Sequence, residues 1–465
     1  MHHQPDRGLL DTSRAQTSPL AVRMAAQLAS FSSAPLAPAL ADKARTCLFD
    51  LIGCAFESGD KAWSRQAKAM AVDLGEDGAT RAGTIIGSSQ RTSLADAAFV
   101  NGVMGHGLVR EDMHSASISH LGVAVLPALL ALSQHKPVCG RRFLLAAVAG
   151  YETGARIGRA LMDARIARLF RPTGITGPLG AAAAGACLLG LNETQTTHAL
   201  ALAANTVAGF NQWGHTGGSE MYFHVGFAAR NGVSAALLAQ AGAFGSPSAL
   251  DGEAGLFASH GKREAADQVR LFEDGAEILA VYHKPVPACN FAQTACQAAL
   301  AIAKAGCPTD QIEAITVRVP IAGANYPGCD FTGPFDHVLQ AKMSIQYNVV
   351  AALMNGDVTE ANFDLLRDPM LHRLLGKTRL EVDDEMTRAY PSQQGGAVEV
   401  NLTGGRRLEK RFADVVNANP HDVVERFRAA AQARVGLAAM KRIESLIDGI
   451  ETAEDSGQLA AALRA

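Results

Sequence analysis

Apolar residues, many of them Ala or Gly, recur at helical spacing through the first half of the chain, and this pattern most limits the possible folds. Counting from Leu40, they occupy positions 44, 47, 48, 51 and 55, which is the spacing of one face of an amphipathic helix. Similar stripes cover 94–103, 122–133, 143–161, 180–191, 193–207 and 225–242. Because small side chains let helices approach closely, the pattern predicts a tightly packed helical bundle.

The composition is that of a chain with a large folded interior. Of the 465 residues, 48% are apolar and 19% are charged, below the roughly 25% charged residues of an average globular protein. This excludes a disordered chain. Because 42 basic and 45 acidic residues leave a formal charge of −3, the chain has no global electrostatic reason to bind a polyanion, and we expect no nucleic-acid partner.

The pattern changes after about residue 270. Apolar and polar residues alternate in AITVRVP from Ala314, in RLEVDD from Arg379 and in VEVNL from Val398, which predicts β-strands. The pair Gly404-Gly405 after the last segment is typical of a hairpin turn. We therefore expect a small antiparallel sheet, flanked by helices over 290–305 and 340–355.

These patterns predict a mainly α protein with two domains. The large all-helical domain comprises 39–270 and 412–465, because helical spacing returns near the C-terminus. A smaller α+β lid domain, 271–411, is inserted between these parts. Residues 1–38 carry Pro, Ser and Gln and are predicted to form a flexible N-terminal arm.

Nothing in the chain predicts a membrane segment or a clustered metal site. The apolar runs 121–132 and 177–191 are short, and Pro127 and Pro178 interrupt them. The polar N-terminus has no apolar signal segment, so we expect a cytoplasmic protein with no membrane partner. The eight cysteines contain no C-x-x-C pair, which favours ordinary cytosolic thiols.

The segment 106–120 contains three imidazoles, those of His106, His114 and His120, and the carboxylates of Glu111 and Asp112. A histidine held by a carboxylate is the commonest group for general acid and base catalysis near neutral pH. The same residues could instead line a solvated loop and cap helices. A metal site of Asp112, His114 and His120 is a third interpretation, although spacings of two and six are no standard helical ligand set.

A Gly-rich segment, 171–180, is interpreted as a loop that enters the next helix. Its backbone N–H groups, with the hydroxyls of Thr173 and Thr176, could hold a carboxylate, and Arg171 could add a bidentate contact. The G-K-[ST] of a phosphate-binding loop is missing. The alternative is a turn that needs glycine for close packing.

Three further polar residues are candidates for the same site. His224 follows a Gly-containing segment, and Lys284 begins KPVPACN, where two prolines stiffen a loop at the predicted domain junction. A desolvated lysine there could bind a carboxylate or donate a proton. Tyr347 lies at the start of a helix and could face the same cleft. Each could equally be a packed or surface side chain.

The order of these segments resembles the MmgE/PrpD family, whose members include 2-methylcitrate dehydratase, cis-aconitate decarboxylase and iminodisuccinate epimerase. The resemblance covers nearly the whole chain from about Leu40 and rests on NGVMGHGLVREDMHSASISHLGVAVLPALLAL, RPTGITGPLGAAAAGACLLGL, HKPVPACNFAQTACQAAL and AKMSIQYNVVAALMNGDV. It implies a helical domain formed by both ends of the chain, an inserted α+β lid, a homodimer, and an active site in the cleft between the domains.

Position by position, the resemblance implies a polar site made of His106, Asp112, His114, His120, Lys284 and Tyr347. The chain departs from the family pattern at several other positions. Val109 and Glu111 stand where the family often has Asp, Met113 where it has Thr, Arg171 where it has His, and Met221 where it has Lys.

We therefore hypothesise a cofactor-independent lyase, first of all a dehydratase, that removes a proton next to a carboxylate of a small di- or tricarboxylic acid such as 2-methylcitrate. His120, oriented by Asp112 or His114, is the expected base, and Lys284 or Tyr347 the expected acid. The expected substrate-binding residues are His106, Arg171, Thr173, Thr176 and His224. We expect no metal and no other cofactor.

The same residues are also consistent with other reactions than dehydration. Epimerisation or isomerisation of an iminodisuccinate-like acid and decarboxylation of a cis-aconitate-like acid could share a carbanion-like intermediate with dehydration. A non-catalytic homologue that only binds carboxylates is a further alternative.

Overall fold

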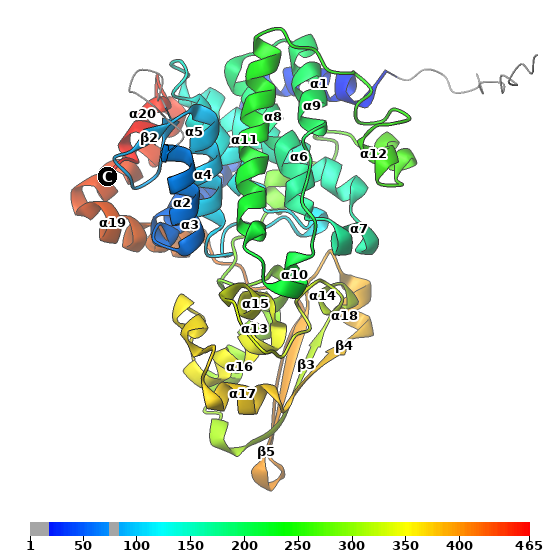
Figure 1. Cartoon of the computed structure of the whole chain (residues 1–465), viewed down its shortest axis with the longest axis vertical. Helices are drawn as coiled ribbons and strands as arrows, with labels where there is room; N and C mark the ends of the chain where they lie inside the picture. The colour runs from blue at the N-terminus through cyan, green and yellow to red at the C-terminus, as the bar shows by residue number, and fades with distance from the viewer. Residues whose placement is uncertain (1–17, 74–82) are drawn as a thin grey trace, which may run out of the picture.

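The computed structural model describes residues 18–73 and 83–465, which form a large helical body and a smaller α+β body (Figure 1). The large body contains α1 (Leu20–Ser33), α2 (Pro38–Ser58), α3 (Ala62–Asp73), α4 (Leu94–His106), α5 (Gly122–Leu132), α6 (Gly140–Leu161), α7 (Ala164–Leu169), α8 (Pro172–Leu189), α9 (Glu193–Ala204), α10 (Trp213–Thr216), α11 (Glu220–Gln240) and α12 (Leu256–Ser259). A two-stranded ribbon, β1 (Gly83–Thr84) and β2 (Arg91–Thr92), precedes α4. The architecture is the expected mainly α fold with a smaller α+β domain.

The N-terminal segment differs from its prediction where the structure describes it. Residues 20–33 form helix α1, which buries Leu20, Met24 and Leu28. The prediction of a flexible arm is wrong for this part, because apolar residues at i, i+4 and i+8 give the helix a face that packs on α9 and α6. Residues 1–17 of the predicted arm lie outside the described residues.

Helix α8 is the centre of the large body. Each of its residues is buried, and it packs against α6, α11 and α5. The helix begins at Pro172, so the Gly-rich segment predicted as a loop is already helical, with Pro178 in the interior of the helix. Its glycines allow close packing: a Cβ at Gly180 would lie 2.8 Å from the Gly150 carbonyl oxygen of α6, and one at Gly174 would lie 2.0 Å from the Ala208 carbonyl oxygen.

The small body is built on a four-stranded sheet with the order β4-β3-β5-β6. Its strands are β3 (Ile312–Val319), β4 (Thr378–Val382), β5 (Gly396–Leu402) and β6 (Arg407–Phe412). The predicted strands and the turn at Gly404-Gly405 are present, but the sheet is mixed rather than antiparallel because β4 pairs parallel to β3. A parallel pair needs a crossover connection, which α14–α17 supply here.

The helices of this body are α13 (Gln293–Lys304), α14 (Ile321–Ala324), α15 (Val338–Met343), α16 (Ile345–Asn355), α17 (Pro369–Leu375) and α18 (Asp384–Ala389). The helix predicted over 340–355 is two helices, because Ser344 leaves the helical conformation and caps α16 by accepting a hydrogen bond from the Tyr347 N–H.

The C-terminal segment returns to the large body. Helix α19 (Pro420–Asp448) packs along α2, and α20 (Gly457–Ala462) contacts α5 and α19. Figure 1 shows both C-terminal helices, in red, beside the blue N-terminal helices of the large body. Among the described helices, none combines the length and the apolar character needed to cross a bilayer.

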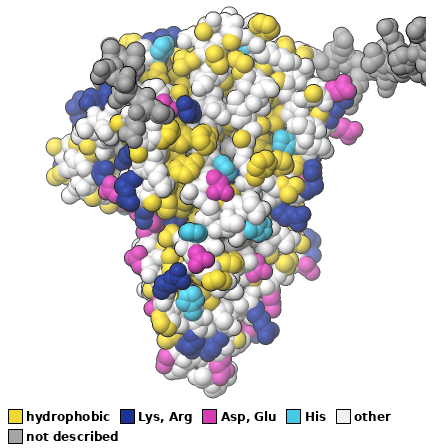
Figure 2. Space-filling view, in the orientation of Figure 1, with side chains coloured by type: hydrophobic (Ala, Val, Ile, Leu, Met, Phe, Trp, Pro, Cys, Tyr) yellow, Lys and Arg dark blue, Asp and Glu magenta, His cyan; other side chains and the backbone are white. Residues whose placement is uncertain are grey.

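The two bodies have different surfaces. Figure 2 shows hydrophobic side chains gathered over the helical body, while charged side chains are common on the small body. Helix α11 contributes Phe227 and Leu238, whose exposed fractions are 46% and 50%. Exposed apolar faces of this kind are common at interaction sites.

We predict that Gly232→Val destabilises the large body. A Cβ at Gly232 of α11 would lie 2.3 Å from the Ala181 Cβ of α8, so the two helices would have to separate. Overpacking of this kind costs about 1–3 kcal/mol of the free energy of unfolding, measurable by urea denaturation. Ser234→Val, at a half-buried position on the same helix, is the control and should change stability by less than about 1 kcal/mol. An equal loss in both variants would contradict close packing at Gly232.

Candidate active site

The loop between α4 and α5 lies at the junction of the two bodies and is held by two buried lysines. The Lys284 ammonium donates to the carbonyl oxygens of Val109 and, at 3.2 Å, Ala288. The Lys342 ammonium, from α15, donates to the Leu108 carbonyl oxygen at 3.0 Å and also pairs with Glu360. Successive carbonyls of the loop are therefore bound by cations from the second half of the chain.

Glu111, in the same loop, joins two imidazoles. Its Oε1 contacts Nδ1 of His106 and lies 2.9 Å from Nδ1 of His120. All three side chains are buried. Although burial favours the neutral acid, the imidazoles of His106 and His120 and the Lys284 charge hold the pKa of Glu111 well below its usual range. Glu111 is therefore an ionised acceptor between two N–H donors.

His120 is a neutral imidazole with one nitrogen available to a ligand. Burial lowers its pKa to about 3, the Lys284 charge acts in the same direction, and Glu111 opposes both. Its Nδ1 faces two acceptors, Glu111 Oε1 and the Asp112 carbonyl oxygen at 3.1 Å, so this nitrogen carries the proton. Its Nε2 makes no hydrogen bond to a described residue and keeps its lone pair.

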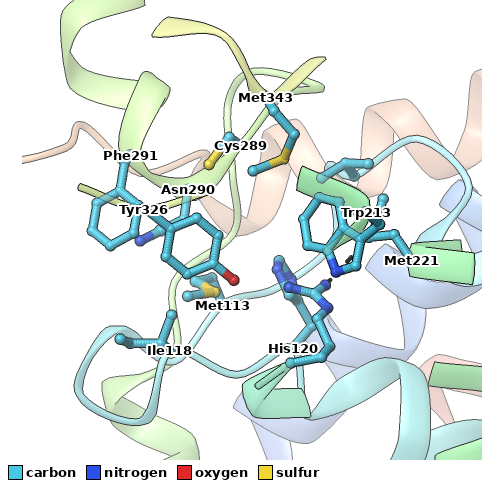
Figure 3. A pocket seen from close by; sticks show the side chains of 12 residues that line it. Met113, Ile118, His120, Trp213, Met221, Cys289, Asn290, Phe291, Tyr326 and Met343 are labelled. Atoms are coloured by element: carbon cyan, nitrogen blue, oxygen red, sulfur yellow. Dashed lines mark hydrogen bonds between the residues drawn. The ribbon is translucent and has the colours of Figure 1, made fainter. Parts of the chain in front are cut away.

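His120 lines a pocket together with Arg171 and Tyr326. In Figure 3, Trp213 and Met221 lie on one side of this pocket, and Tyr326, Phe291 and Ile118 lie on the other. The pocket belongs to both bodies, since His120 precedes α5 and Tyr326 follows α14.

Arg171 supplies a fixed positive charge to the pocket. Its Nη2 donates to His106 Nε2 at 2.9 Å, and the guanidinium lies 5.5 Å from the centroid of the Trp213 ring. Its Nε is buried and has no hydrogen-bond partner among the described residues. A buried donor without a partner is costly, so this guanidinium is ready to bind an anion such as a carboxylate.

Two predicted residues of the loop bond away from the pocket. The Asp112 carboxylate accepts hydrogen bonds from the Tyr151 hydroxyl and, at 3.2 Å, from the Gly122 N–H. His114 Nε2 lies 2.9 Å from Glu277. The expected orientation of His120 by Asp112 or His114 is therefore replaced by Glu111, although the backbone carbonyl of Asp112 also contacts the His120 ring.

The predicted threonines position the site and do not line it. The His120 backbone N–H donates to Thr173 Oγ1 at 3.0 Å, which fixes the start of α5. The Thr176 hydroxyl oxygen lies 2.9 Å from Ser119 Oγ and 3.1 Å from the Pro172 carbonyl oxygen, because α8 begins earlier than expected.

The predicted His224 does not line the pocket either. Burial and the neighbouring Arg171 lower its pKa to about 4, so it is an uncharged neighbour of the arginine.

The expected acids, Lys284 and Tyr347, are occupied elsewhere. Lys284 is fully buried, and its ammonium hydrogens point to loop carbonyls. The Tyr347 hydroxyl donates to the Asn362 carbonyl oxygen at 2.8 Å, and its ring packs on Phe335. Tyr347 is thus a packed side chain, and Tyr326 is the phenol in the pocket.

Sequence reasoning missed several pocket residues. Glu111 was one of the two carboxylates noted in the histidine segment, but Asp112 was expected to orient His120 in its place. Tyr326, Trp213 and Cys289 also line the pocket, and the Cys289 Sγ lies 3.4 Å from the Cys329 Sγ. The chance of finding Tyr326 was small, because its segment has neither helical nor strand periodicity.

The possible metal ligands differ from those considered from the sequence. One nitrogen of each of His106 and His120 and a Glu111 oxygen lie within 4.8 Å of one another. However, Glu111 Oε1 already bridges the two rings, and the Arg171 guanidinium contacts His106. A metal ion would have to replace these hydrogen bonds beside a permanent positive charge, so the arrangement favours proton chemistry.

The fold and the site together define a two-domain protein with a carboxylate–imidazole pair and an arginine in a pocket at the domain junction. The family model described as the MmgE/PrpD N-terminal domain matches residues 22–268, and the MmgE/PrpD C-terminal domain matches residues 286–452. The chain belongs to the MmgE/PrpD family.

Several relatives carry established names. The chain is 28% identical over 389 residues to cis-aconitate decarboxylase of Homo sapiens, covering 79% of each protein. It is 30% identical over 383 residues to the enzyme of that name from Mus musculus, covering 77% of this chain and 75% of the relative. It is 28% identical over 236 residues to 2-methylcitrate dehydratase of Cupriavidus necator, covering 48% of each.

Proposed function

We propose that the protein is a cofactor-independent lyase that acts on a carboxylic acid by removing the proton from the carbon next to a carboxylate. One observation carries this proposal: the His120 ring lines the Arg171 pocket while its Nδ1 lies 2.9 Å from Glu111. A carboxylate–imidazole pair of this geometry is a general base, and the arginine stabilises negative charge that develops on the substrate.

In the proposed reaction, a substrate carboxylate binds the Arg171 guanidinium. His120 Nε2 takes the proton from the neighbouring carbon, and the electron pair of the broken C–H bond is delocalised into the carboxylate beside Arg171. The imidazolium formed is stabilised by Glu111, which accepts the Nδ1–H bond. Glu111 thus orients the base and compensates its charge.

We propose Tyr326 as the acid of the second step. Burial raises the pKa of its phenol, so it carries its proton at neutral pH. In dehydration, the carbanion expels a hydroxide from the adjacent carbon, a C=C bond forms, and the Tyr326 proton completes the leaving water. This assignment replaces Lys284 and Tyr347, which do not line the pocket and whose polar atoms are bonded to backbone carbonyl oxygens.

Decarboxylation is the second candidate, because the relatives matched over most of this chain are named cis-aconitate decarboxylases. In that case the C–C bond to a carboxylate breaks, carbon dioxide leaves, and the carbanion takes a proton from Tyr326. Product analysis by NMR distinguishes the two reactions, with 2-methylcitrate and cis-aconitate as the first acids tested.

We also propose a cytoplasmic homodimer. The exposed apolar residues of α11, Phe227 and Leu238, support an interface on this face. Light scattering measures the oligomeric state directly.

We predict that His120→Gln lowers the rate of proton exchange into D₂O at the carbon next to the carboxylate by at least about 100-fold. Tyr326→Phe should retain this exchange and lose at least about tenfold in product formation, because the tyrosine acts only on the leaving group. NMR measures both rates. His198→Gln, on α9 away from the pocket, should leave both unchanged. Full exchange in His120→Gln would contradict the proposal, and a wild type with neither exchange nor product formation would favour a binding protein.

We predict that kcat/KM keeps its value as the pH falls through 6.5. The lowered pKa of His120, about 3, leaves the base unprotonated at every higher pH, so the ordinary imidazole value should not appear in the profile. Activity should fall only below about pH 5, as the substrate carboxylate becomes protonated. A decline centred near pH 6.5 would show that the base is an ordinary exposed imidazole, contrary to this site.

A further inference from the structure

A second cavity adjoins the pocket. It shares Ile118, Phe291 and Tyr326 with the pocket as lining residues. Figure 3 shows these three side chains together, on the side of the pocket away from Trp213 and Met221. The second cavity therefore continues the pocket in a defined direction.

The second cavity is predominantly apolar and is bounded by both bodies. The large body contributes Met162, Ala164 and Ala167, and the small body contributes Ile321, Ala322 and Pro391. Asp163 also lines the cavity, but its carboxylate is bonded to the Lys262 ammonium at 2.6 Å and to the Ile166 N–H at 2.8 Å. Its charge is thus compensated, whereas Arg168, at an exposed position, adds one positive charge to the otherwise mainly apolar lining.

The charges in the pocket also favour a ligand with few carboxylates. Among the described residues that line it, Arg171 alone carries a permanent positive charge, while Val109, Met113 and Met221 are apolar. Lys284 does not line the pocket, and its ammonium is bound to the carbonyl oxygens of Val109 and Ala288. One carboxylate therefore has a cationic partner, and further carboxylates would be desolvated without one.

We infer that the substrate carries an alkyl substituent, which leaves the pocket between Ile118 and Tyr326 and occupies the second cavity. This inference rests on the proposed function and narrows its substrate class: a carboxylic acid with one carboxylate on Arg171 and a hydrocarbon chain, in place of a compact tricarboxylate. Each methylene group transferred from water into the cavity should tighten binding about fourfold, corresponding to about 0.8 kcal/mol.

The test uses saturated straight-chain monocarboxylates from butanoate to nonanoate, which have no leaving group and are not consumed. Isothermal titration calorimetry of the full chain should give a Kd that falls about fourfold per methylene over the first few carbons. A Kd that does not change with the length of the alkyl chain would overturn the inference. The same result is expected if a second copy of the protein fills the cavity.

Two variants test whether the alkyl chain of the ligand occupies this cavity and no other part of the protein surface. Ala164→Phe and Ala322→Phe fill the cavity from opposite walls, at positions that are exposed and half-buried, so the core is not overpacked. Each should abolish the gain in affinity from longer alkyl chains and leave the Kd of butanoate within about twofold. Ala429→Phe, at an exposed position of α19, is the matched control and should keep the full gain. If both cavity variants kept the increase in affinity with alkyl-chain length, the inference would be overturned.

The outcomes separate this inference from the proposed function. Chain-length dependence with neither proton exchange nor product formation from any acid would support the alkyl-binding cavity and contradict the lyase. Proton exchange with compact acids, and no dependence on chain length, would leave the lyase standing and remove the alkyl substituent.

Discussion

The site depends on two lysine ammonium groups that bind successive backbone carbonyls of one loop. Lys284 and Lys342 come from the second half of the chain, and their partners Val109 and Leu108 come from the first. Val109 has a φ of 58°, a left-handed conformation that a β-branched residue rarely adopts and that costs about 1–3 kcal/mol. The two charge-assisted interactions offset this strain and fix the turn that leads to Glu111.

Because the turn is fixed, one carboxylate can serve two histidines. Glu111 accepts from the Nδ1 of His106 and of His120, so both rings are neutral and both have a defined proton position. His106 then accepts from Arg171, which keeps the guanidinium at the pocket. His120 keeps a free lone pair toward the same space. The base and the anion-binding group are thus parts of one hydrogen-bond network, in which each proton position determines the next.

Sequence patterns predicted the architecture and part of the site. Helical spacing gave the bundle, alternation gave the strands, and His120 and Arg171 were found in segments that meet at the junction. Helix α1 had a readable signal in Leu20, Met24 and Leu28, which was masked by its Pro- and Ser-rich surroundings. The choice of Glu111 over Asp112, and of Tyr326 over Tyr347, depends on which way side chains point after the domains pack. Local spacing carries no such information, so these residues could not be predicted.

The protonation state of His120 tests this account most directly. Nitrogen-15 NMR of the protein labelled at histidine, with His120→Gln to assign the signals, distinguishes the two neutral tautomers from the imidazolium. The account predicts a neutral ring at pH 7 with its proton on Nδ1, held by Glu111. A doubly protonated ring, or a neutral ring with its proton on Nε2, would contradict it.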